Sequence, residues 1–264
     1  MKYTAGFIGA GNMGGALLRA VAASVGGEKV ALYDLSAEKA EKASSLTGAT
    51  FTDAEDIYKN SKYIFMAVKP NTIGKVLSAA SSQIKSKSVI VSMAAGISIA
   101  KIAEASGSDN VIRIMPNTPA SIGEGMILYS TGKGVSPADE KEFLSVMGKS
   151  GKIDKIDEKL IDAAAALSGC GPAFVYMFIE GLADGAVACG VPRDKALLYA
   201  KQTVLGAASL ALTSGKHPEE LKDAVCSPGG TTIEGVLALE HGSFRSDAAS
   251  AVIAAYEKTE KLSK

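Results

Sequence analysis

The stretch Gly9-Ala10-Gly11-Asn12-Met13-Gly14 carries three glycines in the spacing Gly-x-Gly-x-x-Gly. It directly follows the apolar run 3–8 and opens a segment with helical spacing, 13–25. Between a strand and a helix, the first glycine permits a tight turn, the second lets the backbone approach a diphosphate, and the third allows the helix to pack close to the strand. The amide groups and dipole of the helix then face the diphosphate. The stretch therefore predicts a dinucleotide site, with a glycine-rich turn that binds nothing as the alternative.

Around this stretch, the first part of the chain alternates strand-like and helix-like segments. Short apolar runs are typical of buried parallel strands, and segments with helical spacing separate them. The expected strands are 3–8, 30–33, 63–68, 89–92 and 111–114, and the expected helices are 13–25, 37–46, 72–84 and 99–105, followed by a strand, a helix and a strand within 125–155. This alternation predicts a doubly wound parallel sheet, and we assign residues 1–156 to an α/β Rossmann-type dinucleotide-binding domain.

From residue 157 onward, strand-like runs disappear and alanine-rich helical segments follow one another. Glycine and proline separate them, so the expected helices are 157–167, 172–188, 193–213, 218–225, 233–240 and 244–262. Several have small or apolar residues around most of their circumference, as 174–179 does, and such helices need a covering surface. We therefore expect residues 157–264 to form an all-α domain that binds substrate and makes the chain a homo-oligomer, at least a dimer.

Composition argues against several other classes of protein. Of 264 residues, 28 are lysine or arginine and 28 are aspartate or glutamate, and this zero net charge does not favour a nucleic-acid or membrane-surface partner. No run of about 18 apolar residues is free of charge, and the chain opens on a strand-like segment rather than a secretory signal. Three cysteines without a CxxC pair and two histidines do not indicate a disulfide framework or a metal site. We therefore expect a cytoplasmic protein without a bound metal.

Asp34 ends the second predicted strand, twenty residues after Gly14. A carboxylate there can accept hydrogen bonds from the hydroxyls of the adenosine ribose and repel a 2′-phosphate, which favours NADH over NADPH. In the alternatives, Asp34 caps the following turn, or Ser36 and Lys39 hold the phosphate of NADPH. The sequence therefore predicts NAD(P)H as the cofactor, with NADH favoured and NADPH as the alternative.

Three further loops follow strands at the edge where parallel sheets bind their ligands. The first is Ala67-Val68-Lys69-Pro70-Asn71, in which Pro70 suits the first turn of a helix. The second is Ala94-Ala95-Gly96, whose small side chains leave room for a flat nicotinamide ring. The third is Met115-Pro116-Asn117-Thr118-Pro119, which its two prolines make stiff. As ordinary strand-to-helix turns they would bind nothing. We predict that all three loops contact the dinucleotide, the last of them through Asn117.

The most distinctive run in the second part of the chain is Ser227-Pro228-Gly229-Gly230-Thr231-Thr232-Ile233-Glu234. It has the pattern of a glycine loop that leads into a helix. Thr231 and Glu234 have the spacing of a capping box, which predicts a structural role for Thr231. The hydroxyls of Ser227 and Thr232 and the unpaired amides of the helix are then available to bind a small carboxylate or a polar nitrogen.

At this point the sequence resembles a known family, the pyrroline-5-carboxylate reductases, which catalyse the last step of proline biosynthesis. The match runs nearly from end to end, and its most specific part is the run that begins at Ser227. The matching motifs are Phe7-Ile8-Gly9-Ala10-Gly11-Asn12-Met13, Ala67-Val68-Lys69-Pro70, Ala94-Ala95-Gly96-Ile97, Met115-Pro116-Asn117-Thr118-Pro119, Leu167-Ser168-Gly169-Cys170-Gly171-Pro172-Ala173, Leu182-Ala183-Asp184-Gly185, Leu221-Lys222-Asp223 and Ser227-Pro228-Gly229-Gly230-Thr231-Thr232-Ile233.

The resemblance implies an NAD(P)H-dependent oxidoreductase that passes a hydride to C5 of 1-pyrroline-5-carboxylate and forms L-proline. It implies that the dinucleotide contacts Gly9, Ala10, Gly11, Asn12, Met13 and the segment 67–71. It also implies that the imino acid is bound by Ser227, Gly229, Gly230, Thr231 and Thr232, with the Thr232 hydroxyl near the ring nitrogen as the catalytic group. Dimers built from the helical halves, with a decamer as a further assembly, follow from the same resemblance.

Two residues depart from the family's pattern. Cys170 stands where the family commonly has serine, and Asp34 stands where NADP-preferring members usually have a neutral residue. Two other classes of function stay open as alternatives. One is a different imine reductase or a dehydrogenase of small hydroxy acids, the latter with Lys69 or Lys222 as a base. The other is a dinucleotide-responsive sensor that uses the helical domain for assembly.

Overall fold

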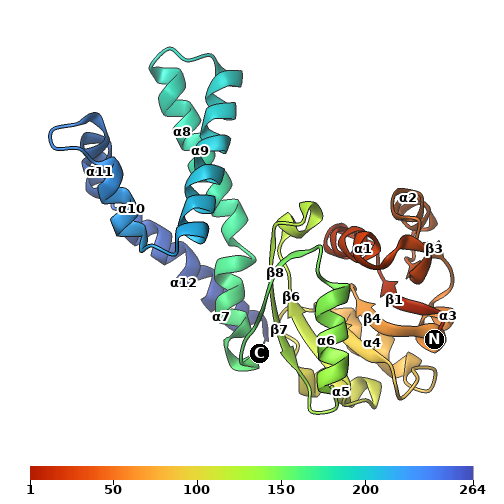
Figure 1. Cartoon of the computed structure of the whole chain (residues 1–264). Coiled ribbons are helices and arrows are strands. Elements are labelled where there is room, and N and C mark those ends of the chain that lie inside the picture. The colour runs from red at the N-terminus through yellow and green to blue at the C-terminus, as the bar shows by residue number, and fades with distance from the viewer. Residues whose placement is uncertain (264) are drawn as a thin grey trace. The chain divides into compact units, whose positions relative to one another are not determined.

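The computed structural model describes residues 1–263, so Lys264, the last residue of the second predicted domain, lies outside the described residues. The chain forms two compact units, of which the first comprises Met1–Cys170 and the C-terminal segment from Ala255, and the second comprises Gly171–Ala254. A domain boundary after residue 156 falls between the last strand of the sheet and the helix that follows it. That helix packs on the sheet and so belongs to the first unit (Figure 1).

The first unit is built on an eight-stranded sheet with the order β3-β2-β1-β4-β5-β6-β7-β8. The strands are β1 (Tyr3–Ile8), β2 (Val30–Tyr33), β3 (Thr50–Phe51), β4 (Ser61–Met66), β5 (Val89–Ser92), β6 (Val111–Met115), β7 (Gly125–Thr131) and β8 (Gly151–Lys155). Neighbouring strands are parallel except β6 and β7, which pair antiparallel. Because β1 has β2 on one side and β4 on the other, the strand order reverses there, and the predicted doubly wound α/β Rossmann-type sheet is confirmed.

Helices cover both faces of this sheet. They are α1 (Asn12–Val25), α2 (Ala37–Thr47), α3 (Ala54–Asn60), α4 (Pro70–Ala80), α5 (Ile99–Ser106), α6 (Pro137–Val146) and α7 (Glu158–Ser168), with short 3-10 turns at Gly27–Lys29 and Thr118–Ile122. In β4, Tyr63 and Phe65 pack in the cluster that contains α1 and α6, whereas Ile64 and Met66 pack in the cluster that contains α3, α4 and α5. A strand that is apolar on both sides is what a parallel sheet between two helix layers requires.

Two elements between β2 and β4 were not expected from the sequence. β3 adds Thr50–Phe51 to the edge of the sheet, and α3 follows it. The carboxylate of Asp53 accepts a hydrogen bond from the N–H of Asp56 at 2.7 Å and so caps α3. A strand of two residues and a helix of seven are too short for an apolar period to stand out. The aspartate cap was the one local signal of the helix.

The buried side chain of Arg113 fixes α7 on the sheet. Arg113 is 3% exposed, its Nη2 lies 2.5 Å from Asp162 Oδ1, and its Nη1 lies 3.5 Å from Glu158 Oε1. Glu158 Oε1 also accepts a hydrogen bond from the N–H of Ile99 at 2.6 Å, at the start of α5. Because a buried guanidinium without carboxylate partners is strongly unfavourable, these ion pairs specify where α7 docks.

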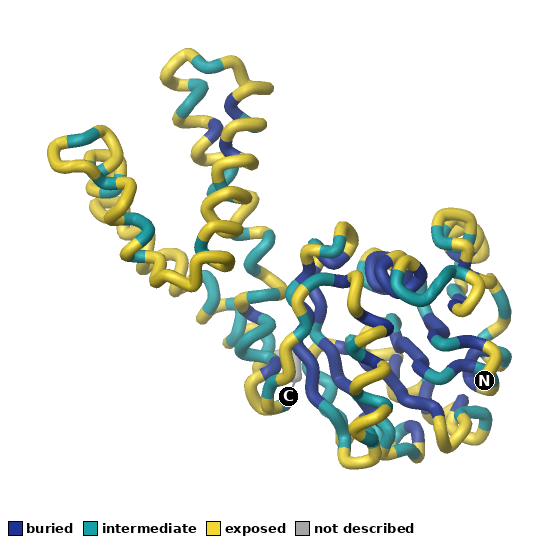
Figure 2. The backbone as a smooth tube through the Cα atoms, viewed as in Figure 1, coloured by how far each residue is buried: buried dark blue, intermediate teal, exposed yellow. Residues whose placement is uncertain are grey.

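The second unit is all-helical, as the sequence predicted. Its helices are α8 (Gly171–Ala188), α9 (Arg193–Ser214), α10 (Pro218–Val225), α11 (Thr231–His241) and the first part of α12 (Phe244–Ser263). Its buried cluster consists of Ala183, Ala196 and Ala200, contributed by α8 and α9. Large apolar side chains point outward instead: Met177 is 73% exposed and Leu212 is 81% exposed, and most of this unit's backbone trace is coloured as exposed (Figure 2).

One helical stretch in the described part of the chain, residues 158–188 in α7 and α8, is long and apolar enough to cross a membrane by length and composition. Length and composition alone do not separate a membrane span from a helix whose apolar side is covered by another protein subunit. The stretch therefore presents an apolar surface that is expected to be buried against another molecule.

Candidate active site

The predicted glycine turn joins β1 to α1, and its first glycine is required by the backbone. Gly9 has a φ of +104°, a conformation that is strained for residues with a side chain. Its N–H donates to the carbonyl oxygen of Tyr33 at 2.7 Å, at the end of β2. A Cβ at Gly9 would lie 2.6 Å from the carbonyl oxygen of Ala67, so the loop after β4 also leaves no room for one.

The other two glycines of the turn have different surroundings. A Cβ at Gly14 would lie 2.5 Å from the carbonyl oxygen of Gly9 and 2.7 Å from the Cβ of Ala67, so Gly14 lets α1 pack directly on the turn. A Cβ at Gly11 would meet no atom within 4 Å, and Gly11 is the N-cap of α1 without a side-chain cap. The first amides of α1 therefore face open space, which is the arrangement that binds a diphosphate. The geometry of this turn fits a dinucleotide.

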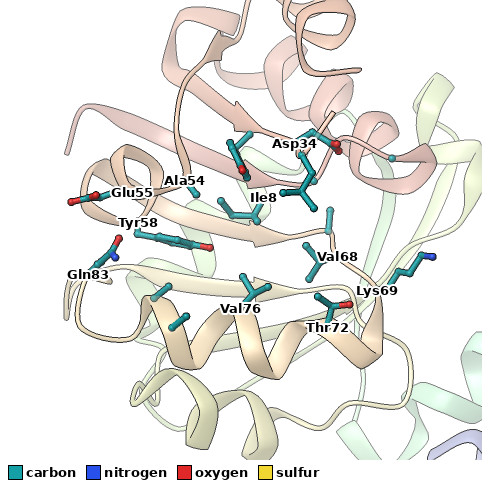
Figure 3. A pocket seen from close by; sticks show the side chains of 17 residues that line it. Ile8, Asp34, Ala54, Glu55, Tyr58, Val68, Lys69, Thr72, Val76 and Gln83 are labelled. Atoms are coloured by element: carbon teal, nitrogen blue, oxygen red, sulfur yellow. The ribbon is translucent and has the colours of Figure 1, made fainter. Parts of the chain in front are cut away.

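A cavity of about 710 Å³ lies beside the turn. It is bounded by the carboxyl ends of β1, β2 and β4 and by helices α3 and α4, and apolar side chains make up most of its wall (Figure 3). Its lining residues are Ile8, Gly9, Gly11, Tyr33, Asp34, Leu35, Ala54, Glu55, Tyr58, Ala67, Val68, Lys69, Thr72, Val76, Ala79, Ala80 and Gln83. A mainly apolar cavity of this size beside such a glycine turn suits the adenosine half of a dinucleotide.

The carboxylate of Asp34 is held by two backbone amides. Its Oδ2 accepts from the N–H of Ala10 at 2.7 Å, within the glycine turn, and its Oδ1 accepts from the N–H of Ser36 at 2.9 Å. The expectation that Asp34 caps the turn after β2 is therefore confirmed. Asp34 also lines the cavity, so the two roles foreseen for this carboxylate occur at the same position.

A second, smaller hollow of about 530 Å³ lies on the other side of the glycine turn, between α1 and α2. Ala10, Gly11 and Asn12 form one wall of it. Arg19, Lys39 and Lys42 also line this hollow, which has no acidic residue among its lining side chains. Lys39, foreseen as an alternative phosphate ligand, thus faces this hollow and not the larger cavity.

The loop after β4 forms part of the larger cavity. In the sheet, Ile8 pairs with Tyr33 on one side and with Met66 on the other. The segments that follow these three residues therefore emerge side by side. Ala67, Val68 and Lys69 line the cavity, as the sequence predicted for a ligand-binding loop. Pro70 is the first residue of α4, which begins two residues earlier than expected because proline suits that position. Asn71 is exposed, and its Oδ1 accepts from the Thr72 hydroxyl at 3.1 Å.

The loops after β5 and β6 lie at the same edge of the sheet. The loop after β5 lines neither cavity, whereas Thr118 of the loop after β6 lines the smaller hollow. Ala94 is 1% exposed and packs with α4 and α5, while Ala95 is exposed and Gly96 has a φ of +71°. Asn117 is 7% exposed, its Nδ2 donates to the carbonyl oxygen of Ser168 at 2.9 Å, and its Oδ1 accepts from the N–H of Met126 at 2.9 Å. Asn117 therefore ties its loop to the end of α7 and to β7.

Leu35 and Tyr58 are among the cavity residues that sequence reasoning missed. Leu35 is 93% exposed directly after Asp34 and lines the cavity, so a bound ligand would cover it. Tyr58 projects from α3 into the cavity and is 5% exposed, and burial raises the pKa of Tyr58 to about 12. Both lie in segments whose position depends on how the chain between β2 and β4 folds, which no local pattern in the sequence determines.

The predicted substrate loop lies in the second unit, before α11. Gly229 has a φ of +67°, and the N–H of Gly230 donates to the carbonyl oxygen of Ser227 at 3.0 Å, which closes a tight turn. Ser227, Thr231 and Thr232 are exposed, and their hydroxyls have no hydrogen-bond partner within the described residues. Their hydroxyls and the first amides of α11 are together free to bind a small anion.

The predicted capping role of Thr231 is wrong. The N-cap of α11 is Gly230, which has no side-chain cap, and Thr231 is the first residue inside the helix. Thr231 therefore has a helical backbone, and its side chain cannot fold back onto the amide two or three residues ahead as a cap does. The capping-box spacing placed the start of the helix one residue too late.

Lys222 is not suited to the role of a general base. Its Nζ lies 2.8 Å from Glu219 Oε2 and 3.1 Å from Asp223 Oδ1. Hydrogen bonds with these two carboxylates raise the pKa of Lys222 above its usual value, so the side chain stays protonated at neutral pH. This position therefore gives no support to the alternative of a hydroxy-acid dehydrogenase with Lys222 as base.

Comparisons with known proteins agree along the whole chain. Two family models match: pyrroline-5-carboxylate reductase dimerisation over residues 158–262, and NADP oxidoreductase, coenzyme F420-dependent, over residues 4–96. The chain is 42% identical to a pyrroline-5-carboxylate reductase of Arabidopsis thaliana, over 99% of this chain and 96% of the relative, and 41% identical to that of Escherichia coli K12, over 100% of both. The crystal structure of Plasmodium falciparum pyrroline carboxylate reductase with NADP bound has a TM-score of 0.89 at 34% identity, covering 100% of both chains.

The contact between Gly14 and the glycine turn gives a first prediction. Gly14→Ala puts a methyl group against the Gly9 carbonyl and Ala67, so α1 must shift, and overpacking of this kind costs about 1–3 kcal/mol. We expect NADH to bind at least about tenfold more weakly, measured by the enhancement of its fluorescence. Gly74→Ala is the control, since its Cβ meets no atom within 4 Å in α4 and should leave binding unchanged. Wild-type affinity in Gly14→Ala would refute the packing role.

Proposed function

The chain belongs to the pyrroline-5-carboxylate reductase family, and on this basis we propose how its residues share the reaction. The enzyme reduces 1-pyrroline-5-carboxylate to L-proline with NAD(P)H, by hydride transfer to the C=N bond, which is the final step of proline biosynthesis. The observation that carries this function is the end-to-end match to pyrroline-5-carboxylate reductases, which covers 99% of this chain for one relative and 100% for another.

The chemistry makes modest demands on the protein. The electrophile is a carbon–nitrogen double bond, which is most reactive when its nitrogen is protonated. The iminium nitrogen already carries its proton and the charge that makes C5 electron-poor, so the protein does not have to supply an acid at that nitrogen. The bound nicotinamide supplies the hydride. Orientation of the imino acid is then the main contribution of the chain, and effective molarities cover roughly 7–11 kcal/mol in well-aligned cases.

We assign the imino acid to the turn before α11. In this proposal Ser227 and the free amides after Gly230 bind the carboxylate, and the absence of a side chain at Gly229 and Gly230 leaves the backbone accessible to it. Thr231 lines the pocket. The Thr232 hydroxyl hydrogen-bonds the ring nitrogen as its geometry changes from planar to tetrahedral. The exposed position of these hydroxyls and their lack of partners in the described chain support the assignment.

We assign the dinucleotide to the carboxyl edge of the sheet. The amides at the start of α1 hold the diphosphate, the larger cavity takes the adenosine, and the loop of small residues after β5 lies along the nicotinamide. Besides the contact proposed for it, Asn117 holds its own loop in place through hydrogen bonds with Ser168 and Met126. The proposed contacts are Gly9, Ala10, Gly11, Asn12, Met13, Asp34, Ala67, Val68, Lys69, Pro70, Asn71, Ala94, Ala95, Gly96 and Asn117.

We propose that Asp34 makes NADH the preferred cofactor, with NADPH as the alternative. Its carboxylate is at the cavity wall and is held there by the amides of Ala10 and Ser36. A carboxylate with two backbone partners cannot rotate away from a 2′-phosphate. Electrostatic repulsion between the carboxylate and the phosphate therefore weakens the binding of NADPH relative to NADH. The hollow lined by Arg19, Lys39 and Lys42 is the feature that would favour NADPH instead.

We further propose that residues 157–264 form a helical domain that joins two subunits, and that the enzyme works in the cytoplasm. The family model for dimerisation matches this domain, and its outward-facing large side chains, such as Met177 and Leu212, need a covering surface. A decamer would arise by further association of five such dimers. The apolar stretch 158–188 is then covered by protein and not by lipid.

The role of Thr232 is tested by Thr232→Ala. Purified wild-type enzyme should oxidise NADH when 1-pyrroline-5-carboxylate is added, and the variant should have a kcat lowered about ten- to a hundredfold, the effect of one or two hydrogen bonds. Thr213→Ala, in α9, is the control and should keep the wild-type kcat. An unchanged kcat in Thr232→Ala would remove Thr232 from the mechanism, and no turnover by the wild type would overturn the function itself.

Coenzyme choice is tested by Asp34→Asn, which removes the charge and keeps the size of the side chain. A unit charge pair at about 4 Å interacts by about 1 kcal/mol in water, and the phosphate carries more than one charge, so the ratio of kcat/KM for NADPH to that for NADH should rise roughly tenfold. Glu38→Gln, an acid in the first turn of α2 that does not line the cavity, should leave the ratio unchanged. An unchanged ratio in Asp34→Asn would assign coenzyme choice to other residues.

Light scattering in detergent-free buffer tests the assembly. The chain has a mass of 27.0 kDa, and we expect an even multiple of it. Met177→Glu, on the exposed face of α8, should lower the mass towards that of the monomer, because a charge replaces a side chain in the dimer interface. Ile122→Glu, which is 78% exposed in the first unit, should still form the dimer. A wild-type monomer, or precipitation without detergent, would contradict the proposed dimer.

A further inference from the structure

Tyr58 differs from the other buried tyrosines of the first unit in the partner of its hydroxyl. The Tyr3 hydroxyl hydrogen-bonds Asp56 at 3.1 Å, the Tyr63 hydroxyl bonds the Asp139 carbonyl at 2.7 Å, and the Tyr129 hydroxyl bonds Glu140 at 2.8 Å. Tyr58 is 5% exposed, and its hydroxyl has no hydrogen-bond partner among the described residues. The hydroxyl oxygen is not enclosed in the core but opens onto the larger cavity, so solvent is its partner until a ligand binds.

The unpaired hydroxyl faces the larger cavity. Figure 3 shows the Tyr58 ring entering from α3, with its oxygen directed into the cavity towards Ile8 and Val76. The side chains around it are mainly apolar, so the protein offers it no partner there. Burial raises the pKa of Tyr58 to about 12, so at neutral pH the phenol keeps its proton and can donate it. The hydroxyl is therefore a polar group kept ready for a ligand.

The position of Tyr58 along the cavity identifies the part of the ligand that reaches it. Asp34 and Gly9 mark the end of the cavity where the ribose and diphosphate bind, whereas α3 and the end of α4, with Ala80 and Gln83, form the opposite end. Figure 3 shows Asp34 and Gln83 at opposite sides of the view with Tyr58 between them. A base attached to that ribose extends towards Tyr58. Adenine is flat, fits an apolar slot and carries ring nitrogens that accept hydrogen bonds.

We propose that the Tyr58 hydroxyl donates a hydrogen bond to the adenine base of the coenzyme, which makes Tyr58 a specificity-determining residue for the adenosine half. The proposal rests on the proposed dinucleotide site and extends it to a residue of α3. It gives the phenol a partner in the protein–ligand complex, and it explains why a tyrosine and not a phenylalanine stands at this place in a mainly apolar wall. Bound coenzyme also covers Leu35, the exposed apolar neighbour at the ribose end.

Tyr58→Phe removes the hydroxyl and keeps the ring. We expect the dissociation constants of NADH and of adenosine monophosphate, measured by calorimetry on the intact enzyme, to rise by the same factor of about three to ten, the effect of one hydrogen bond. Binding of reduced nicotinamide mononucleotide, which has no adenine, should be unchanged. The melting temperature of the ligand-free protein should not fall, because the hydroxyl has no partner to lose.

Tyr129→Phe is the matched control, since Tyr129 is 4% exposed and its hydroxyl does bond Glu140. The melting temperature of this variant should fall and its affinity for adenosine monophosphate should be unchanged, which is the reverse of the pattern expected for Tyr58→Phe. Unchanged binding of adenosine monophosphate to Tyr58→Phe, or an equal loss for reduced nicotinamide mononucleotide, would overturn the proposal. The readout is binding and not turnover, so a failure of the reductase assay and a failure of this proposal are distinguishable.

Discussion

The proposed dinucleotide site depends on the close approach of three backbone segments, at Gly9, Gly14 and Ala67. The missing side chain of Gly14 lets α1 begin directly against the Gly9 carbonyl, and the positive φ of Gly9 turns the chain out of β1 beneath Ala67. These contacts fix the direction of α1, and with it the direction of the free amides at its start. The cavity wall is built outward from this turn, because β2 and β4 lie in register on either side of β1.

Asp34 shows how one carboxylate can serve the fold and the ligand together. Taken from the sequence, capping of a turn and selection against a 2′-phosphate are alternatives for this residue. In the structure the amides of Ala10 and Ser36 hold both oxygens at the cavity wall, so the structural bonds are what keep the negative charge in place. Immobilising a charge makes its repulsion of a second anion harder to relieve, and the structural role therefore strengthens the proposed selectivity.

The sequence predicted those features whose signals are local. Apolar runs and helical spacing predicted the strands and the division into an α/β part and an all-α part. The spacing of the glycines predicted the turn between β1 and α1. Features that depend on tertiary position could not be predicted from the sequence. Tyr58 reaches the cavity only because α3 packs beside β1 and β4, and the Asn117 amide donates to the carbonyl oxygen of Ser168, 51 residues away in sequence. The error at Thr231 has a different origin, since a capping box and a helix that starts one residue earlier look alike in sequence.

The second unit places its small side chains inside and its large ones outside. Ala183, Ala196 and Ala200 let α8 and α9 approach closely, and in consequence side chains such as Met177 and Leu212 point away from the only buried cluster of this unit in the described chain. Lipid is a poor cover for this surface, because Glu180 and Asp184 lie exposed within the same apolar helix, and each charge costs about 2.5–3.5 kcal/mol at the centre of a bilayer. A protein surface can cover the apolar side chains while such charges find partners or water, as Asp184 does with Arg193 at 2.5 Å. The arrangement therefore favours a second subunit as the missing part of this core.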